Sequence, residues 1–265
     1  MTESEAISYE LRGNIALIAI DRPSKRNAMN QAMFEALGKA AQRAQEEARV
    51  GIIYSRNENF SAGLDLAEHM GRTPIDGLHD SRAQHALLNI VEQGKIPFIA
   101  ALQGATIGAG LEIAASAHIR VADATTYFAL PEGKRGIFVG GGGSVRVARL
   151  LSVTRMVEMM LTSRVVKADE ALAANLVNFV TAEGGALDKA LELASGIATN
   201  SPISNYAIIN ALPRIHDMSH DDGLFVESLM AAMTQTSPEA QAGLKQFIEK
   251  KADRLKPVAA QASKS

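Results

Sequence analysis

The sequence predicts an α/β fold followed by a helical region. Short strand-like runs alternate with helical segments over the first two-thirds of the chain, and strand signals nearly vanish after about Ala168. Of the 265 residues, 47% are hydrophobic, which is enough to build a sizeable core. We therefore expect a core of residues 1–195 and a helical region of residues 196–265.

The first elements are two strand-like runs, residues 7–12 and 15–21, of which the second ends at Asp21-Arg22-Pro23. After a break, Asn30 is in position to cap a helix whose apolar residues recur at helical spacing. Further strands are expected at residues 51–54, 98–102, 119–122 and 126–129. Further helices are expected at residues 80–93 and 107–117, from about Ser144, and at residues 186–199, 202–212, 223–233 and 238–251.

Composition and charge exclude several classes of protein. The formal net charge is −2, which argues against a general nucleic-acid or membrane-surface binder. The chain has no cysteine, so disulfides and thiolate chemistry are excluded. The acidic start does not resemble a signal peptide, and no apolar run is long enough to span a bilayer. A cytoplasmic enzyme or binding protein is expected.

Glu112 is the first candidate for chemistry. It lies in the run Ile107-Gly108-Ala109-Gly110-Leu111-Glu112-Ile113, in which every other residue is apolar or glycine. A helix that is apolar all round is usually buried, and burial raises the pKa of a carboxyl group toward neutrality, where it serves as an acid or base. A structural glutamate, exposed or paired with an arginine, is the alternative.

Glu132 is the second candidate, because it lies between Pro131 and Gly133 in a turn that follows a predicted strand. Taken alone, it is better interpreted as a solvated turn residue. Small residues occur at two other places, around Gly63 and around Gly108, where backbone N–H groups can approach a ligand closely. Such groups can form an oxyanion hole, or the glycines can simply allow tight packing.

Other patterns carry less information. Lys25 and Arg26 precede the helix that Asn30 caps, which suits phosphate binding but also suits a solvated loop. The glycine run at residues 140–143 lacks the lysine of a P-loop, and no nucleophile elbow occurs. His216 and His220 have the spacing of a metal pair, but a surface turn is the preferred interpretation, so no metal site is predicted.

Together these segments resemble the crotonase superfamily, whose type member is enoyl-CoA hydratase. The resemblance runs from about Ile15 to the C-terminus. It is carried, in order, by Asp21-Arg22-Pro23-Ser24-Lys25-Arg26-Asn27-Ala28-Met29, by Asn59-Phe60-Ser61-Ala62-Gly63-Leu64-Asp65-Leu66, by residues 104–112, by Leu130-Pro131-Glu132 with Gly136, and by Gly140–Gly143 with Arg146. Any one motif is weak, but their order and spacing are specific.

The resemblance implies a core of repeated ββα units in a spiral and a C-terminal helical region that forms trimers, often paired into hexamers. It implies an oxyanion hole made by the backbone N–H groups of Leu64 and Ala109, with Gly140 near the attacking water. It implies that coenzyme A lies against a further set of residues. These are Lys25, Arg26, Ala28, Ala62, Asp65 and Leu66, with Phe247 and Lys256 on a C-terminal helix.

Because both glutamates match positions at which hydratases of this family carry theirs, the resemblance implies the addition of water to a 2-enoyl-CoA, as in fatty acid metabolism. Coenzyme A would be part of the substrate, and no separate cofactor is expected. An enoyl-CoA isomerase or a hydratase-lyase is the nearest alternative. A non-catalytic CoA- or RNA-binding protein is another, because the C-terminal helix is rich in lysine. Ala109, where glycine is usual, and Phe138-Val139, where a proline-bearing stretch is usual, predict an unusual acyl pocket.

Overall fold

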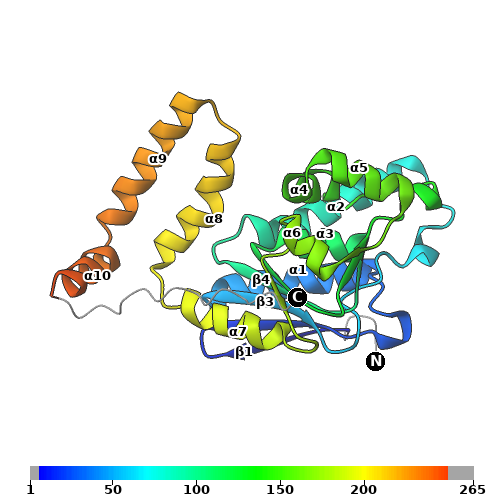
Figure 1. The fold of residues 1–265 in the computed structure, drawn as a ribbon, viewed down its shortest axis with the longest axis horizontal. Helices are drawn as coiled ribbons and strands as arrows, with labels where there is room; N and C mark the ends of the chain where they lie inside the picture. The colour runs from blue at the N-terminus through cyan, green and yellow to red at the C-terminus, as the bar shows by residue number, and fades with distance from the viewer. Residues whose placement is uncertain (1–5, 250–265) are drawn as a thin grey trace. The chain divides into compact units, whose positions relative to one another are not determined.

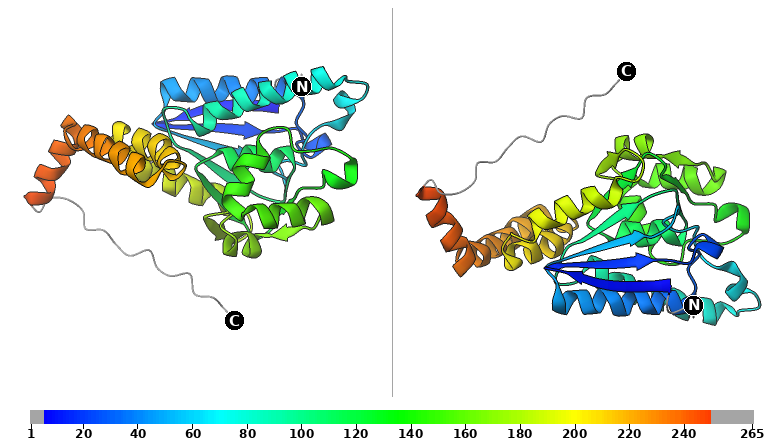
Figure 2. Two further views of the ribbon diagram at one scale, coloured as in Figure 1. Left: turned by 90° about the horizontal axis from the view of Figure 1, so that it is seen from above. Right: turned by 90° about the horizontal axis from the view of Figure 1, so that it is seen from below.

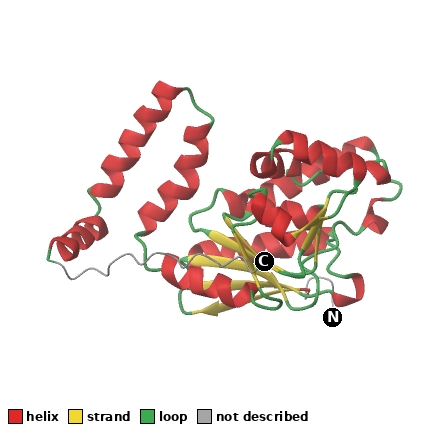
Figure 3. Ribbon diagram, viewed as in Figure 1, coloured by secondary structure: helices red, strands yellow, loops and turns green. Residues whose placement is uncertain are grey.

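The computed structural model describes residues 6–249. Its internal contacts divide the chain into two compact units, residues 1–210 and residues 211–265, and each is described by itself. The first unit contains a six-stranded and a three-stranded sheet with helices packed against them, which confirms the predicted α/β class (Figures 1 and 3). The larger sheet consists of β1 (Ile7–Arg12), β2 (Ile15–Ile20), β3 (Val50–Ser55), β4 (Phe98–Leu102), β6 (Ile119–Asp123) and β9 (Phe179–Thr181), in that order.

The larger sheet is covered on both faces. β1 and β2 are antiparallel and the other neighbours are parallel. Along β2, Ala16 and Ile18 pack in the cluster that includes α1 (Gln31–Glu47), whereas Ile15 and Leu17 pack in the cluster that includes α7 (Ala186–Ile197) (Figure 2). Alternate side chains of a strand point to opposite faces, so a strand between two layers of helices is apolar throughout.

The helix starts follow local capping chemistry. Asn30 caps α1 as predicted, since its side chain accepts a hydrogen bond of 2.9 Å from the backbone N–H of Met33. α2 (Pro74–Glu92) begins earlier than the predicted residue 80, because Thr73 and Asp76 form a reciprocal capping box and Pro74 occupies the first turn. These two helices pack against each other beside the sheet.

The smaller sheet brings the two candidate glutamates together. β5 (Ala105–Ile107) and β7 (Tyr127–Ala129) are parallel, so the chain leaves both at the same edge. β5 leads into α3 (Ala109–Ser116), which begins two residues later than predicted because Ile107 belongs to the strand. β7 leads into the turn that carries Glu132. The remaining elements of this part are β8 (Val166–Lys167), α4 (Gly143–Leu151), α5 (Val153–Thr162) and α6 (Ala168–Ala173).

The expected loss of strands after Ala168 is wrong. β9 pairs with β6 in the larger sheet, and α7 packs on that sheet, so both belong to the first unit. β9 was missed because three residues are too short to produce an alternating pattern. The last helices are α8 (Pro202–His216), α9 (His220–Gln235) and α10 (Pro238–Ile248). Among the described residues, no helix is long and apolar enough to cross a bilayer.

Candidate active site

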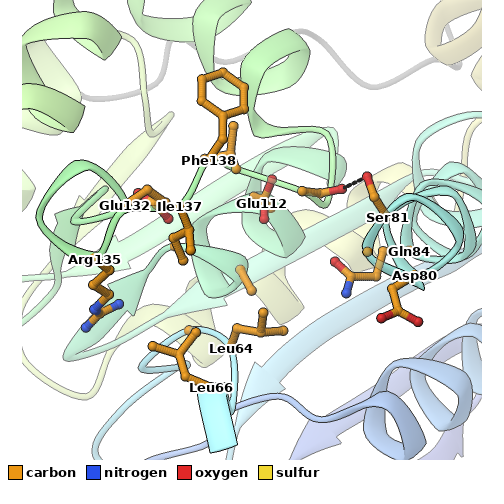
Figure 4. Close-up of a pocket in the computed structure, with 16 residues that line it drawn as sticks. Leu64, Leu66, Asp80, Ser81, Gln84, Glu112, Glu132, Arg135, Ile137 and Phe138 are labelled. Atoms are coloured by element: carbon orange, nitrogen blue, oxygen red, sulfur yellow. Dashed lines mark hydrogen bonds between the residues drawn. The ribbon is translucent and has the colours of Figure 1, made fainter. Parts of the chain in front are cut away.

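Glu112 and Glu132 line one pocket, which has a volume of about 270 Å³ (Figure 4). Glu112 lies in the first turn of α3, and Glu132 lies in the turn after β7. Leu64, Ala109 and Gly140, the other predicted catalytic residues, line the same pocket. The fold therefore gathers residues from four motifs that are separate in the sequence.

The carboxyl group of Glu112 is held by the backbone of the glycine run. Its Oε1 accepts hydrogen bonds of 2.8 Å from the N–H groups of both Gly141 and Gly143. A Cβ atom on Gly143 would lie 2.9 Å from this Oε1, and one on Gly141 would lie 3.0 Å from Oε2. A side chain at either position would crowd the carboxyl group, so the glycine run acts as a cradle for it.

Glu112 is buried, with an exposure of only 3%. Burial raises the pKa of this carboxyl group above its usual range, although the N–H groups of Gly143, Gly141 and Gly140 and the charge of Arg146 act in the opposite direction. A carboxyl group with a raised pKa can accept and return a proton near neutral pH.

Glu132 is also buried, with 5% exposure. A Cβ atom on Gly108, whose φ is +50°, would lie only 2.9 Å from Glu132 Oε1, so the start of α3 runs directly beside this carboxyl group. Burial raises the pKa of Glu132, and the charge of Glu112 raises it further, against the effects of its own backbone and of Arg135. Its Oε2 has no hydrogen-bond partner within residues 6–249.

Leu64 and Ala109 line the same pocket as the two carboxyl groups. Ala109 is the first residue of α3, whose N–H has no partner within the helix. Gly63, with φ of +104°, approaches so closely that its Cβ atom would lie 3.9 Å from the Ala109 nitrogen. No backbone hydrogen bond from Leu64 or Ala109 to another loop occurs in the described part of the chain. Both N–H groups can therefore bind a ligand oxygen.

Six of the eight residues predicted to contact coenzyme A lie in two segments, residues 25–28 and 62–66, that are joined by hydrogen bonds. Lys25 and Arg26 are exposed, and Ala28 is half-buried. The Ala62 N–H donates to the Arg26 carbonyl at 2.9 Å, which attaches the second loop to the first. Leu66, on the second loop, lines the pocket.

Asp65 has a structural partner that the sequence did not indicate. Its Oδ2 lies 2.8 Å from Arg22 Nη1. Burial raises the pKa of Asp65, but the hydrogen bond from Arg22 and the charges of Lys25 and Arg22 outweigh it and hold the pKa below its usual value. Asn27, which is completely buried, bonds Ser55 through its side chain and reinforces the same loop.

Several residues at the pocket were missed. Asp80, Ser81 and Gln84 line it from α2, and Arg135 lines it from the loop after Glu132 (Figure 4). Phe138, which the sequence predicts to shape the acyl pocket, also lines it. Arg146, which is buried behind the pocket, donates to the Gly141 carbonyl at 2.8 Å and pairs with Glu92. The polar face of α2 is visible in the sequence, but nothing there indicates which loop it would meet.

The remaining candidate residues lie elsewhere in the chain. Phe247 is exposed on α10, in the second unit, and Lys256 lies outside the described residues. His216 and His220 gather no further ligands, because no cluster of three or more histidine, aspartate or glutamate side chains suited to a metal occurs within residues 6–249.

The chain is similar to known proteins over nearly its whole length. The profile of the enoyl-CoA hydratase/isomerase family matches residues 10–256. An enoyl-CoA hydratase of Mycobacterium tuberculosis is 30% identical over 92% of this chain and 93% of its own length. The 2,3-dehydroadipyl-CoA hydratase of Escherichia coli is 30% identical over 91% of this chain and 95% of its own.

The fold is shared as well. A crystal structure from Rhodopseudomonas palustris, described as a candidate enoyl-CoA hydratase, superposes with a TM-score of 0.91 at 42% identity, over 95% of this chain and 97% of that one. The motifs, the sheets and the paired glutamates thus agree with a single family. The chain belongs to the enoyl-CoA hydratase/isomerase family, within the crotonase superfamily.

Proposed function

We propose that the protein hydrates 2-enoyl-CoA thioesters. The observation that carries this proposal is one pocket lined by two buried carboxyl groups and by two residues whose backbone N–H groups are used by no other loop within residues 6–249. Both carboxyl groups have raised pKa values. Hydration needs one base for the water, one acid for the α-carbon and a stabilised thioester oxygen, and the pocket offers candidates for each.

The proposed steps follow from charge. The N–H groups of Leu64 and Ala109 stabilise the negative oxygen of the enolate-like intermediate, each donor contributing about 3–4 kcal/mol. Glu112, as the carboxylate, accepts a proton from the attacking water near Gly140. Glu132, as the acid, donates a proton to the α-carbon. Because the two carboxyl groups interact, their titration belongs to the pair.

Coenzyme A enters as part of the substrate, and no separate cofactor is needed. The exposed Lys25 and Arg26 provide positive charge for its phosphates, while Leu66 continues the apolar wall of the pocket. Ala28, Ala62 and Asp65 shape the two loops that carry these residues. Phe247 and Lys256 are predicted to contact coenzyme A from the C-terminal helix.

The helical unit supports self-association into trimers or hexamers. α9 and α10 carry large apolar side chains that are exposed in the single chain, which is typical of an interaction surface. They are Leu224, Phe225, Leu229, Met233, Leu244, Phe247 and Ile248. Light scattering coupled to size exclusion would test this, and a monomer at micromolar concentration would contradict it.

The activity is tested by following the loss of enoyl-thioester absorbance with crotonyl-CoA and with branched and aromatic enoyl-CoA substrates. Hydration of at least one substrate is expected, with the 3-hydroxyacyl product identified by mass. A shift of the double bond without water uptake would indicate an isomerase. Binding of acyl-CoA with no reaction on any substrate would indicate a non-catalytic member of the family.

A further inference from the structure

Gln84 is a buried polar residue of the pocket that the proposed reaction does not yet use. It lies on α2 with 6% exposure, and its side-chain amide points into the pocket toward Glu112 (Figure 4). No hydrogen bond joins this amide to another group in the described part of the chain. Because Gln84 lines the pocket, its amide can donate to or accept from a polar atom of a ligand there.

The position of the amide oxygen identifies where that atom would lie. A Cβ atom added to Gly141 would lie 3.0 Å from Glu112 Oε2 and 3.4 Å from Gln84 Oε1. Both oxygens therefore face one small volume that is open because residue 141 has no side chain. Glu112 Oε1 already accepts the two backbone N–H groups, so Oε2 is the oxygen directed to this volume.

These are the surroundings that a water molecule with two hydrogens to donate would take. An O–H donor and an oxygen acceptor are typically 2.5–3.0 Å apart. A water oxygen that lies between Glu112 Oε2 and Gln84 Oε1, farther from Gly141 Cα than a bonded methyl group, can donate one hydrogen to each of them. Glu112 and Gln84 both line the pocket that the reacting carbons would occupy.

We propose that Gln84 is a catalytic residue that binds the attacking water and, after reaction, the product hydroxyl. This inference rests on the proposed hydratase function. One hydrogen of the water passes to Glu112, and the other is donated to Gln84 Oε1, which turns a lone pair of the oxygen toward the β-carbon. As the O–C bond forms, the π electrons move toward the α-carbon, which takes its proton from Glu132. The product hydroxyl keeps the hydrogen that Gln84 accepts.

The test uses Gln84→Met, which removes the amide at nearly unchanged length. For hydration of crotonyl-CoA, or of the best substrate found, we expect kcat to fall about 10-fold and KM to change less than twofold. Gly141→Ala places a methyl group in the water volume without requiring a positive φ, and we expect at least the same loss.

A binding measurement separates water binding from folding. In a Glu132→Gln background, which prevents turnover, dissociation constants are measured for 3-hydroxybutyryl-CoA and for butyryl-CoA. Adding Gln84→Met should raise the dissociation constant of 3-hydroxybutyryl-CoA about 3- to 10-fold and change that of butyryl-CoA less than twofold. Gln42→Met, at an exposed position of α1, is the control and should change neither ligand.

The outcomes are distinct. If the wild type hydrates an enoyl-CoA, and Gln84→Met keeps its kcat within twofold and prefers the hydroxylated ligand as strongly, this inference is wrong. The proposed function is then unaffected. A wild-type protein that hydrates no enoyl-CoA overturns the proposed function and the role of Gln84 together. If Gln84→Met does not fold, full activity in Gly141→Ala would still contradict a water site beside Gly141.

Discussion

Replacing Glu112 with glutamine should reduce activity and increase stability at the same time. The carboxylate receives two backbone hydrogen bonds, worth about 1.5–3 kcal/mol each, but burying the charge costs several kcal/mol. The raised pKa of Glu112 shows that the cost of burial is the larger effect. A glutamine oxygen can accept the same two hydrogen bonds without carrying a charge.

We expect kcat/KM to fall about 100- to 10,000-fold, because glutamine cannot accept the proton. The fall corresponds to about 2.7–5.4 kcal/mol of transition-state stabilisation. At pH 8 the free energy of unfolding should rise. For a chain of this size a gain of about 1 kcal/mol raises Tm by about 2–4 °C, which calorimetry detects.

The stability gain should depend on pH with a defined sign. Since the pKa of Glu112 is higher in the folded state, its contribution to stability is present at low pH and is lost as pH rises through the folded pKa. The advantage of Glu112→Gln is therefore largest at pH 8 and disappears near pH ~4.3, the unfolded pKa of glutamate. Glu46→Gln, at an exposed position of α1, is the control and should change stability by less than about 0.5 kcal/mol. A variant that is less stable than wild type at pH 8, or that keeps more than a tenth of the activity, would refute this reasoning.

Three further substitutions test other parts of the site. Gly108→Ala places a methyl group 2.9 Å from Glu132 Oε1 at a positive φ, so kcat should fall at least about 10-fold while circular dichroism stays unchanged; normal kinetics would show that the carboxyl group can move aside. Asp65→Asn removes the partner of Arg22 and should lower the free energy of unfolding in urea by about 1–3 kcal/mol, whereas an unchanged midpoint would mean that the pair contributes nothing. Phe138→Ala, at an exposed pocket residue, should leave Tm within about 2 °C and change relative kcat/KM values across an acyl-CoA series; an unchanged series would exclude it from the acyl pocket.

Much of the fold could be predicted because its signals are local. The cap at Asn30 and the long apolar runs of β2 and α3 depend on neighbouring residues only. Short elements such as β5 and β9 form because partner strands are present, so three residues carry no periodic signal of their own. α2 was placed too late because its start depends on the Thr73–Asp76 capping box, not on apolar spacing.

Some residues of the site could also be predicted from local sequence, and others could not. Glu112 was conspicuous as a charge in an apolar helix, and Glu132 became a candidate through the order of the surrounding motifs. Gln84 and Arg22 could not be found, because each matters only through a residue far away in the sequence that the fold brings near. For Gln84 that partner is Gly141, a residue with no side chain at all.

The cradle of Glu112 also bears on how this enzyme could change. Its hydrogen bonds come from the backbone at residues 141 and 143, and every residue type except proline supplies the same N–H group. Substitutions at these two residues can crowd the carboxyl group, but, proline apart, they do not remove the N–H groups that donate to it. Arg146, which holds the Gly141 carbonyl from behind, is the nearest adjustable group. The pKa of Glu112, the proposed base, is therefore best altered by changing its buried neighbours. Redesign of the reaction should begin with those side chains and not with the glycine run itself.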